Sequence, residues 1–89
     1  MTHYLKTWPR YFQRIKDNEK TFEVRFNDRD YQTGDHLVLM EYNPEEEVYT
    51  GEELNREISY ILHGGQFGID KGYVVMGLYN RLWWNFLVY

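Results

Sequence analysis

The sequence predicts a single α+β domain in which mostly antiparallel strands form a barrel-like sheet beside one or two short helices. Short segments of alternating apolar and polar residues recur along the chain, turn residues such as Gly34-Asp35 separate them, and one amphipathic stripe comes early. Because 89 residues support only one core, we expect one domain over residues 1–79, followed by an aromatic tail at residues 80–89.

The amphipathic stripe predicts a helix over residues 9–17. Its apolar residues fall at positions i, i+3, i+4 and i+7, the spacing of one helix face: Trp8, Tyr11, Phe12 and Ile15. Pro9 suits the first helical turn, with Thr7 or Trp8 at the cap. Asn18 tolerates the left-handed conformation that often ends a helix, so we expect the helix to stop there.

Five or six strands are expected around this helix. Their predicted ranges are 4–6, 21–26, 36–42, 48–50, 55–63 and 73–79. Strand 21–26 alternates strictly, and we expect its apolar residues Phe22, Val24 and Phe26 to face the core. A closed or nearly closed barrel would remove the exposed edges of so small a sheet. The predicted core is Phe12, Ile15, Phe22, Val24, Leu37, Leu39, Ile58, Tyr60, Val74, Met76 and Leu78.

The polar residues on and beside strand 21–26 form the candidate ligand site. Lys20 and Arg25 could hold a phosphate, and Glu23 could accept a hydrogen bond from a base amino group or a ribose hydroxyl. A purely structural alternative is equally simple. In that alternative Glu23 and Arg25 pair with each other, or with Arg29 and Asp35, across the mouth of the barrel.

Aromatic side chains near that face would favour nucleic-acid binding, because bases stack on any exposed ring. The candidates are Trp8, Tyr31, Tyr42 and Phe67. We expect Tyr31, which follows a polar loop, to be exposed, and Trp8 and Phe67 to belong to the core. The predicted ligand-binding residues are therefore Lys20, Glu23, Arg25, Arg29 and Tyr31.

The order of helix, strand and Gly-Asp turn resembles the ASCH domains of the PUA-like superfamily. Their pattern is Gly-x-Lys-x-x-Glu-x-Arg after a first helix. Lys20, Glu23 and Arg25 match it, and Asn18 replaces the glycine. The chain is also similar, over residues 3–79, to the DUF3850 family of small bacterial and phage proteins. The matching segments include 4–7, 27–29, 34–35, 49–51, 65–68 and 72–77. The resemblance implies a PUA-like fold and an RNA- or nucleotide-binding module.

The same resemblance raises an enzymatic alternative. Some small ASCH proteins hydrolyse N4-acetylcytidine with a lysine, a threonine and a later glutamate. Lys20 matches the lysine, but Glu23 stands where the threonine would be, and Asp70 is the carboxylate available in the later segment. We therefore expect a binding module first and a small nucleoside amidohydrolase, with Lys20 as its catalytic residue, second.

Composition narrows the remaining classes of function. The chain has no cysteine, its net charge is −4, and its three histidines lack metal-ligand spacing, so we expect no metal, no cofactor and a cytoplasmic location. Seven of the ten Lys and Arg residues lie in the first 30 positions, which is compatible with one local anion-binding face. No segment is long enough to span a membrane. The tail could pack on its own barrel, on a second copy or on another partner. Trp83 and Trp84 would point to opposite faces of a strand, so we favour a homodimer contact.

Overall fold

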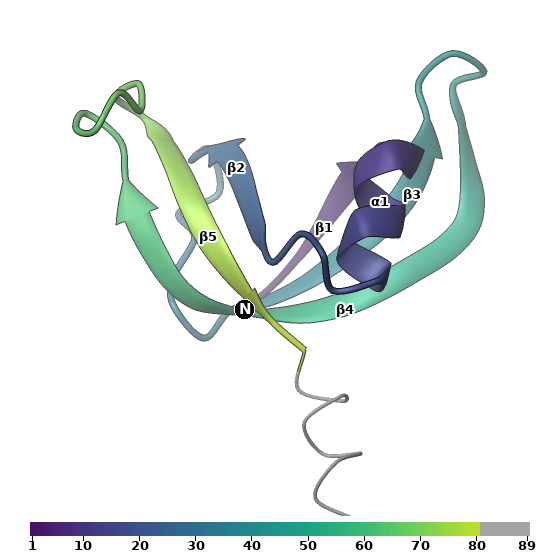
Figure 1. Ribbon diagram of the computed structural model, residues 1–89, viewed down its shortest axis with the longest axis horizontal. Coiled ribbons are helices and arrows are strands. Elements are labelled where there is room, and N and C mark those ends of the chain that lie inside the picture. Colours follow the sequence, from purple (N-terminus) through teal and green to yellow (C-terminus); the bar gives the residue numbers. More distant parts are fainter. Residues whose placement is uncertain (81–89) are drawn as a thin grey trace, which may run out of the picture.

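One five-stranded sheet curls around the core as an open half-barrel (Figure 1). The computed structural model describes residues 1–80. Their elements are β1 (Thr2–Thr7), α1 (Pro9–Lys16), β2 (Phe22–Phe26), β3 (His36–Asn43), β4 (Val48–His63) and β5 (Tyr73–Tyr79). The tail and its predicted homodimer contact lie, apart from Asn80, outside the described residues. Within residues 1–80, no helix has the length and apolar character needed to cross a membrane.

The strands lie in the order β1-β3-β4-β5-β2. The pairs β3–β4, β4–β5 and β5–β2 are antiparallel, which confirms a mostly antiparallel, barrel-like α+β fold. The pair β1–β3 is parallel, because the chain passes through α1 and β2 before it returns beside β1. Among the described residues no ladder joins β1 to β2, so the expected closure of the barrel is wrong.

The core fills the concave side of the sheet, beside α1. Its buried cluster consists of Leu5, Ile15, Tyr31, Leu37, Leu39, Ile58, Ile61, Val74 and Met76. The helix buries Phe12 and Ile15, as its stripe predicts, and Asn18 has the expected positive φ of 60° just after it. From β4, the buried Arg56 donates from Nη2 to the Ile15 carbonyl at 3.0 Å, which ties the end of α1 to the sheet.

The predicted orientation of strand 21–26 is reversed in the structure. Glu23 lies opposite Met76 of β5 and is only 5% exposed, whereas Phe22, Val24 and Phe26 are 46–56% exposed on the other face. Alternation separates two faces without saying which one is inside. β2 is an edge strand, and Glu23 and Arg25 of its polar face line a cleft, whereas its apolar face is largely exposed.

The single long strand β4 replaces two predicted strands, 48–50 and 55–63. Its register against β5 shifts between Ile58 and Ile61. Such an irregularity changes the phase of the alternation, so both isoleucines are buried and Tyr60, predicted as core, is 67% exposed.

Candidate ligand-binding cleft

The polar face of β2 lines a cleft that it shares with the end of β1 and the start of α1. The cleft has a volume of about 510 Å³. It is lined by Lys6, Thr7, Trp8, Tyr11, Lys20, Glu23, Val24 and Arg25. Three of the five predicted site residues, Lys20, Glu23 and Arg25, therefore lie together.

The Glu23 carboxylate is buried, and both of its oxygens accept hydrogen bonds from cations. Lys20 donates from Nζ to Oε1 at 2.5 Å, and Arg25 donates from Nε to Oε2 at 2.9 Å. Charge-assisted bonds of this kind are stronger than neutral ones and fix the carboxylate in place. Two cations share one carboxylate, so this group of three side chains, the Glu23 network, carries an excess positive charge.

Lys20, Arg25 and also Arg29 bond to backbone carbonyls at the sheet edges. Lys20 Nζ donates to the Phe22 carbonyl at 2.7 Å. Arg25 Nη2 donates to the Lys6 carbonyl of β1, also at 2.7 Å, and Arg29 Nη1 reaches the Tyr4 carbonyl at the same distance. Side chains from β2 and the loop after it thus bridge the gap to β1 where no strand ladder closes it. The pairing of Glu23 with Arg25, which the sequence suggested as a purely structural alternative, is therefore present in the fold. This pairing leaves the cleft open.

Thr7 brings to the cleft a polar group that the described protein does not satisfy. The residue is 3% exposed, and its Oγ1 has no hydrogen-bond partner within residues 1–80. The hydroxyl does not cap α1, because the N-cap is Trp8 and no side-chain cap bond forms there. Since buried hydroxyls are normally paired, this one is a candidate partner for a ligand.

Two exposed rings stand at the cleft. Trp8 and Tyr11 are 51% and 39% exposed, their ring centroids are 6.3 Å apart and their planes differ by 22°. The expectation that Trp8 belongs to the core is therefore wrong, since it precedes α1 at the cleft rather than beneath it. On the β1 side, Lys6 Nζ lies 4.4 Å from the ring centroid of Tyr42, within the range of a cation–π contact.

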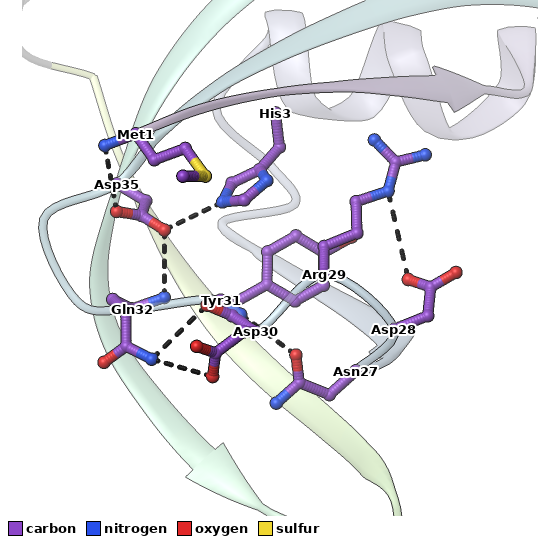
Figure 2. A network of polar contacts seen from close by, with 9 residues as sticks. All are labelled: Met1, His3, Asn27, Asp28, Arg29, Asp30, Tyr31, Gln32 and Asp35. Carbon is purple, nitrogen blue, oxygen red and sulfur yellow. Dashed lines mark hydrogen bonds and ion pairs between the residues drawn. The ribbon is translucent and has the colours of Figure 1, made fainter.

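Tyr31 does not reach the cleft. Figure 2 shows it in the loop that follows β2, with its ring beside His3. The two rings pack edge-on, and their centroids are 4.8 Å apart. The ring is 2% exposed, and burial raises the pKa of the Tyr31 phenol. Asp30, at φ 49°, redirects the chain so that Tyr31 turns into the core, and the predicted exposed ring is therefore wrong. Arg29 stays at the surface beside β1 and does not line the cleft.

Asp35 organises the buried end of the same loop (Figure 2). Its carboxylate accepts hydrogen bonds from His3 Nε2 at 2.8 Å, from the Gln32 backbone N–H at 3.0 Å and from the Met1 amino group at 3.3 Å. The bond from His3 makes the largest contribution to lowering the pKa of Asp35. None of these residues lines the cleft, so this network supports the fold beside the site.

The glycine-rich loop after β4 is also separate from the cleft. Phe67 at its tip is 82% exposed, which contradicts its assignment to the core. Asp70, the carboxylate considered for the enzymatic alternative, does not line the cleft either. Over residues 1–80, His, Asp and Glu side chains nowhere form a group of three or more that could hold a metal ion.

Replacing Thr7 with valine tests whether its hydroxyl is structural. Valine has the same shape, so removing an unpaired buried hydroxyl should leave the free energy of unfolding unchanged or raise it by about 1 kcal/mol. Urea denaturation of both proteins measures the change. A loss of more than about 1 kcal/mol would show that the hydroxyl has a partner within the protein.

A search of curated proteins gives no match. A family model described as "Domain of unknown function (DUF3850)" matches residues 2–78, which contain all but the last residue of the half-barrel and every residue that lines the cleft. The chain therefore belongs to the DUF3850 family.

Proposed function

We propose that the cleft binds an unpaired nucleobase, either in RNA or in a nucleotide-like ligand. The observation that carries this proposal is the juxtaposition of exposed rings with a buried, charge-paired carboxylate. Trp8 and Tyr11 offer a stacking surface, and Glu23 offers a fixed acceptor in the same cleft.

Each part of the cleft matches a different part of a nucleotide. A base stacked on an aromatic side chain gains about 1–3 kcal/mol. Each oxygen of Glu23 already accepts one bond from a cation and retains a lone pair for a base N–H or a ribose hydroxyl. The Thr7 hydroxyl can donate or accept one more bond, and a ligand would end its unpaired state.

The charge distribution favours a short ligand over a long duplex. The whole chain carries a net charge of −4, which opposes non-specific binding to a polyanion. Lys6, Lys20 and Arg25 nevertheless bring positive charge to the cleft, where one phosphate could lie. Sequence-specific RNA recognition mostly uses unstacked bases in loops and at ends, and a cleft of this size suits such a base.

The test is titration of the protein with short single-stranded RNAs and with nucleosides at two salt concentrations. Trp8→Ala should weaken binding about tenfold, because it removes one stacking partner and leaves the Glu23 network intact. Thr7→Val should weaken binding without loss of stability. Phe67→Ala is the matched control, since it removes an exposed ring outside the cleft and should bind as the wild type does. Equal binding by Trp8→Ala and Phe67→Ala, or no binding to any ligand, would contradict the proposal.

One observation favours the enzymatic alternative as a second candidate. A lysine, a carboxylate and a threonine line the same cleft, although Glu23 and Thr7 stand at other positions in the chain than the resemblance implies. In such a reaction water adds to the amide carbon of N4-acetylcytidine, the C–N bond breaks, and cytidine and acetate are released. Cytidine formed by the wild type and lost in Lys20→Ala would rank this activity above simple binding.

We further propose that the half-barrel is a PUA-like domain of the ASCH kind that acts in the cytoplasm. The matching positions Lys20, Glu23 and Arg25 support the ASCH likeness, and all three line one cleft. The cytoplasmic location is inferred from the cysteine-free sequence.

A further inference from the structure

The outer face of β2 and β5 is an apolar surface that the described residues leave uncovered. Phe22, Val24 and Phe26 of β2 point away from the core and are 46%, 50% and 56% exposed, and Val24 also borders the cleft. Their cross-strand partners on β5 are Gly77, Val75 and Tyr73, so these six residues share one side of the sheet. We call this surface the β2–β5 outer face.

The apolar face continues from β5 onto the neighbouring strand β4. Leu62 of β4 lies opposite Val75 and is partly exposed. At one end Phe26 packs edge-on against Tyr73, which is itself 41% exposed, with centroids 5.5 Å apart. Exposed apolar side chains scattered singly are ordinary, but a contiguous apolar face of this kind marks a site of interaction.

The end of β5 places the remaining chain beside this face. The Leu78 amide donates to the Thr21 carbonyl at 2.9 Å, so the chain leaves β5 next to the start of β2. Residues 81–89 follow directly. Seven of these nine residues are apolar or aromatic: Leu82, Trp83, Trp84, Phe86, Leu87, Val88 and Tyr89.

The length of this segment matches the face. The four residue steps from Phe22 to Phe26 cover about 13 Å along β2. Nine residues span about 13 Å at the rise of a helix and about 30 Å when fully extended. In either conformation they can reach from Phe22 to Phe26.

We propose that residues 81–89 dock on the β2–β5 outer face of their own chain. Because this segment is covalently joined to β5, its binding to the face is an intramolecular event. The effective concentration of a segment on a short tether is of the order of millimolar. The homodimer expected from the sequence would use the same segment, but it would have to form against this intramolecular competition.

The test uses the full-length chain. Because the sequence contains no cysteine, Tyr89→Cys creates a single site for a nitroxide spin label. In a 15N-labelled sample, the amide signals of Val24, Phe26 and Tyr73 should lose intensity and regain it when the nitroxide is reduced. Amides at the tip of the β3–β4 hairpin, such as that of Glu46, are the internal control and should keep their intensity.

A mixed sample separates this proposal from a dimer. It combines 15N-labelled chains without the nitroxide and unlabelled chains that carry it, so only contacts between molecules broaden signals. Unchanged signals in the mixture support docking within one chain, whereas broadening of the β2–β5 outer face there would assign the contact to a second copy and overturn the proposal. No broadening of that face in either sample would also overturn it.

A substitution on the face provides an independent check. Val75→Lys places a charge in the middle of the face without entering the core and should abolish the intensity loss at Phe26 and Tyr73. Thr50→Lys, at an exposed position in the control hairpin, should leave that loss unchanged. Intensity losses that persist fully in a folded Val75→Lys protein would contradict docking on this face.

Discussion

Replacing Glu23 with glutamine should lower the free energy of unfolding by about 3 kcal/mol or more. Glu23 is buried and neutralises both Lys20 and Arg25, so the substitution leaves two partly buried cations without their counter-charge. Breaking a buried ion pair by removing one partner typically costs about 3–5 kcal/mol. Urea denaturation near neutral pH, with the midpoint and the slope compared with the wild type, measures the loss.

Glu19→Gln is the matched control for this prediction. Glu19 accepts a bond from Arg14 at 2.7 Å, which is close to the distance between Arg25 and Glu23. The side chains of Arg14 and Glu19 are, however, both more than half exposed. Exposed pairs contribute about 0–1 kcal/mol, so this variant should be nearly as stable as the wild type. If Glu23→Gln costs no more than Glu19→Gln, the Glu23 network does not stabilise the fold, and a role in ligand binding alone remains.

Replacing Asp35 with asparagine should cost roughly 2–3 kcal/mol near neutral pH, because three donors lose a charged acceptor. The loss should also depend on pH. The bond from His3 lowers the pKa of Asp35 in the folded protein below its ordinary value of 3.8. The stabilisation by this carboxylate is therefore complete above about pH 4 and disappears as the pH falls from there through the lower, folded-state pKa.

Denaturation of both proteins near neutral pH and at about pH 3 tests this dependence. The difference in stability between the wild type and Asp35→Asn should shrink at the lower pH. Asp30→Asn is the control, since Asp30 is an exposed acid of the same loop whose carboxylate accepts a bond from Gln32 Nε2 at 3.0 Å. A gap between wild type and Asp35→Asn that stays constant with pH would show that the charge of Asp35 is not what stabilises the loop.

Local sequence patterns predict much of this fold. The stripe ending at Ile15 and the left-handed Asn18 define α1 to within a residue, and five strands lie close to their expected ranges. The grouping of Lys20, Glu23 and Arg25 was also predictable, because it depends on one short strand and the two residues before it. These features share a local physical cause, namely backbone geometry that repeats every two residues or every 3.6.

The rest of the site depends on which side of the sheet becomes the interior. A strictly alternating strand is equally consistent with Phe22 inside or Glu23 inside, and only its place at the sheet edge decides between them. From the sequence, Thr7 is a candidate helix cap and Trp8 a predicted core residue, because these residue types commonly have these roles next to a helix. Their role at the cleft arises from the return of β2 past the end of β1, which no local pattern encodes.

The parallel pairing of β1 with β3 has a consequence for the order in which the domain assembles. A turn of four residues joins β3 to β4 and a loop of nine residues joins β4 to β5, whereas β1 reaches β3 across residues 8–35 and β2 reaches β5 across residues 27–72. Long loops are entropically costly to close, so the β3–β4–β5 meander can form early and the two outer strands add to it later. The cleft is built from β1, α1 and β2, so it is completed last. A ligand that bridges them would hold together the segments that contribute least to the early folding nucleus.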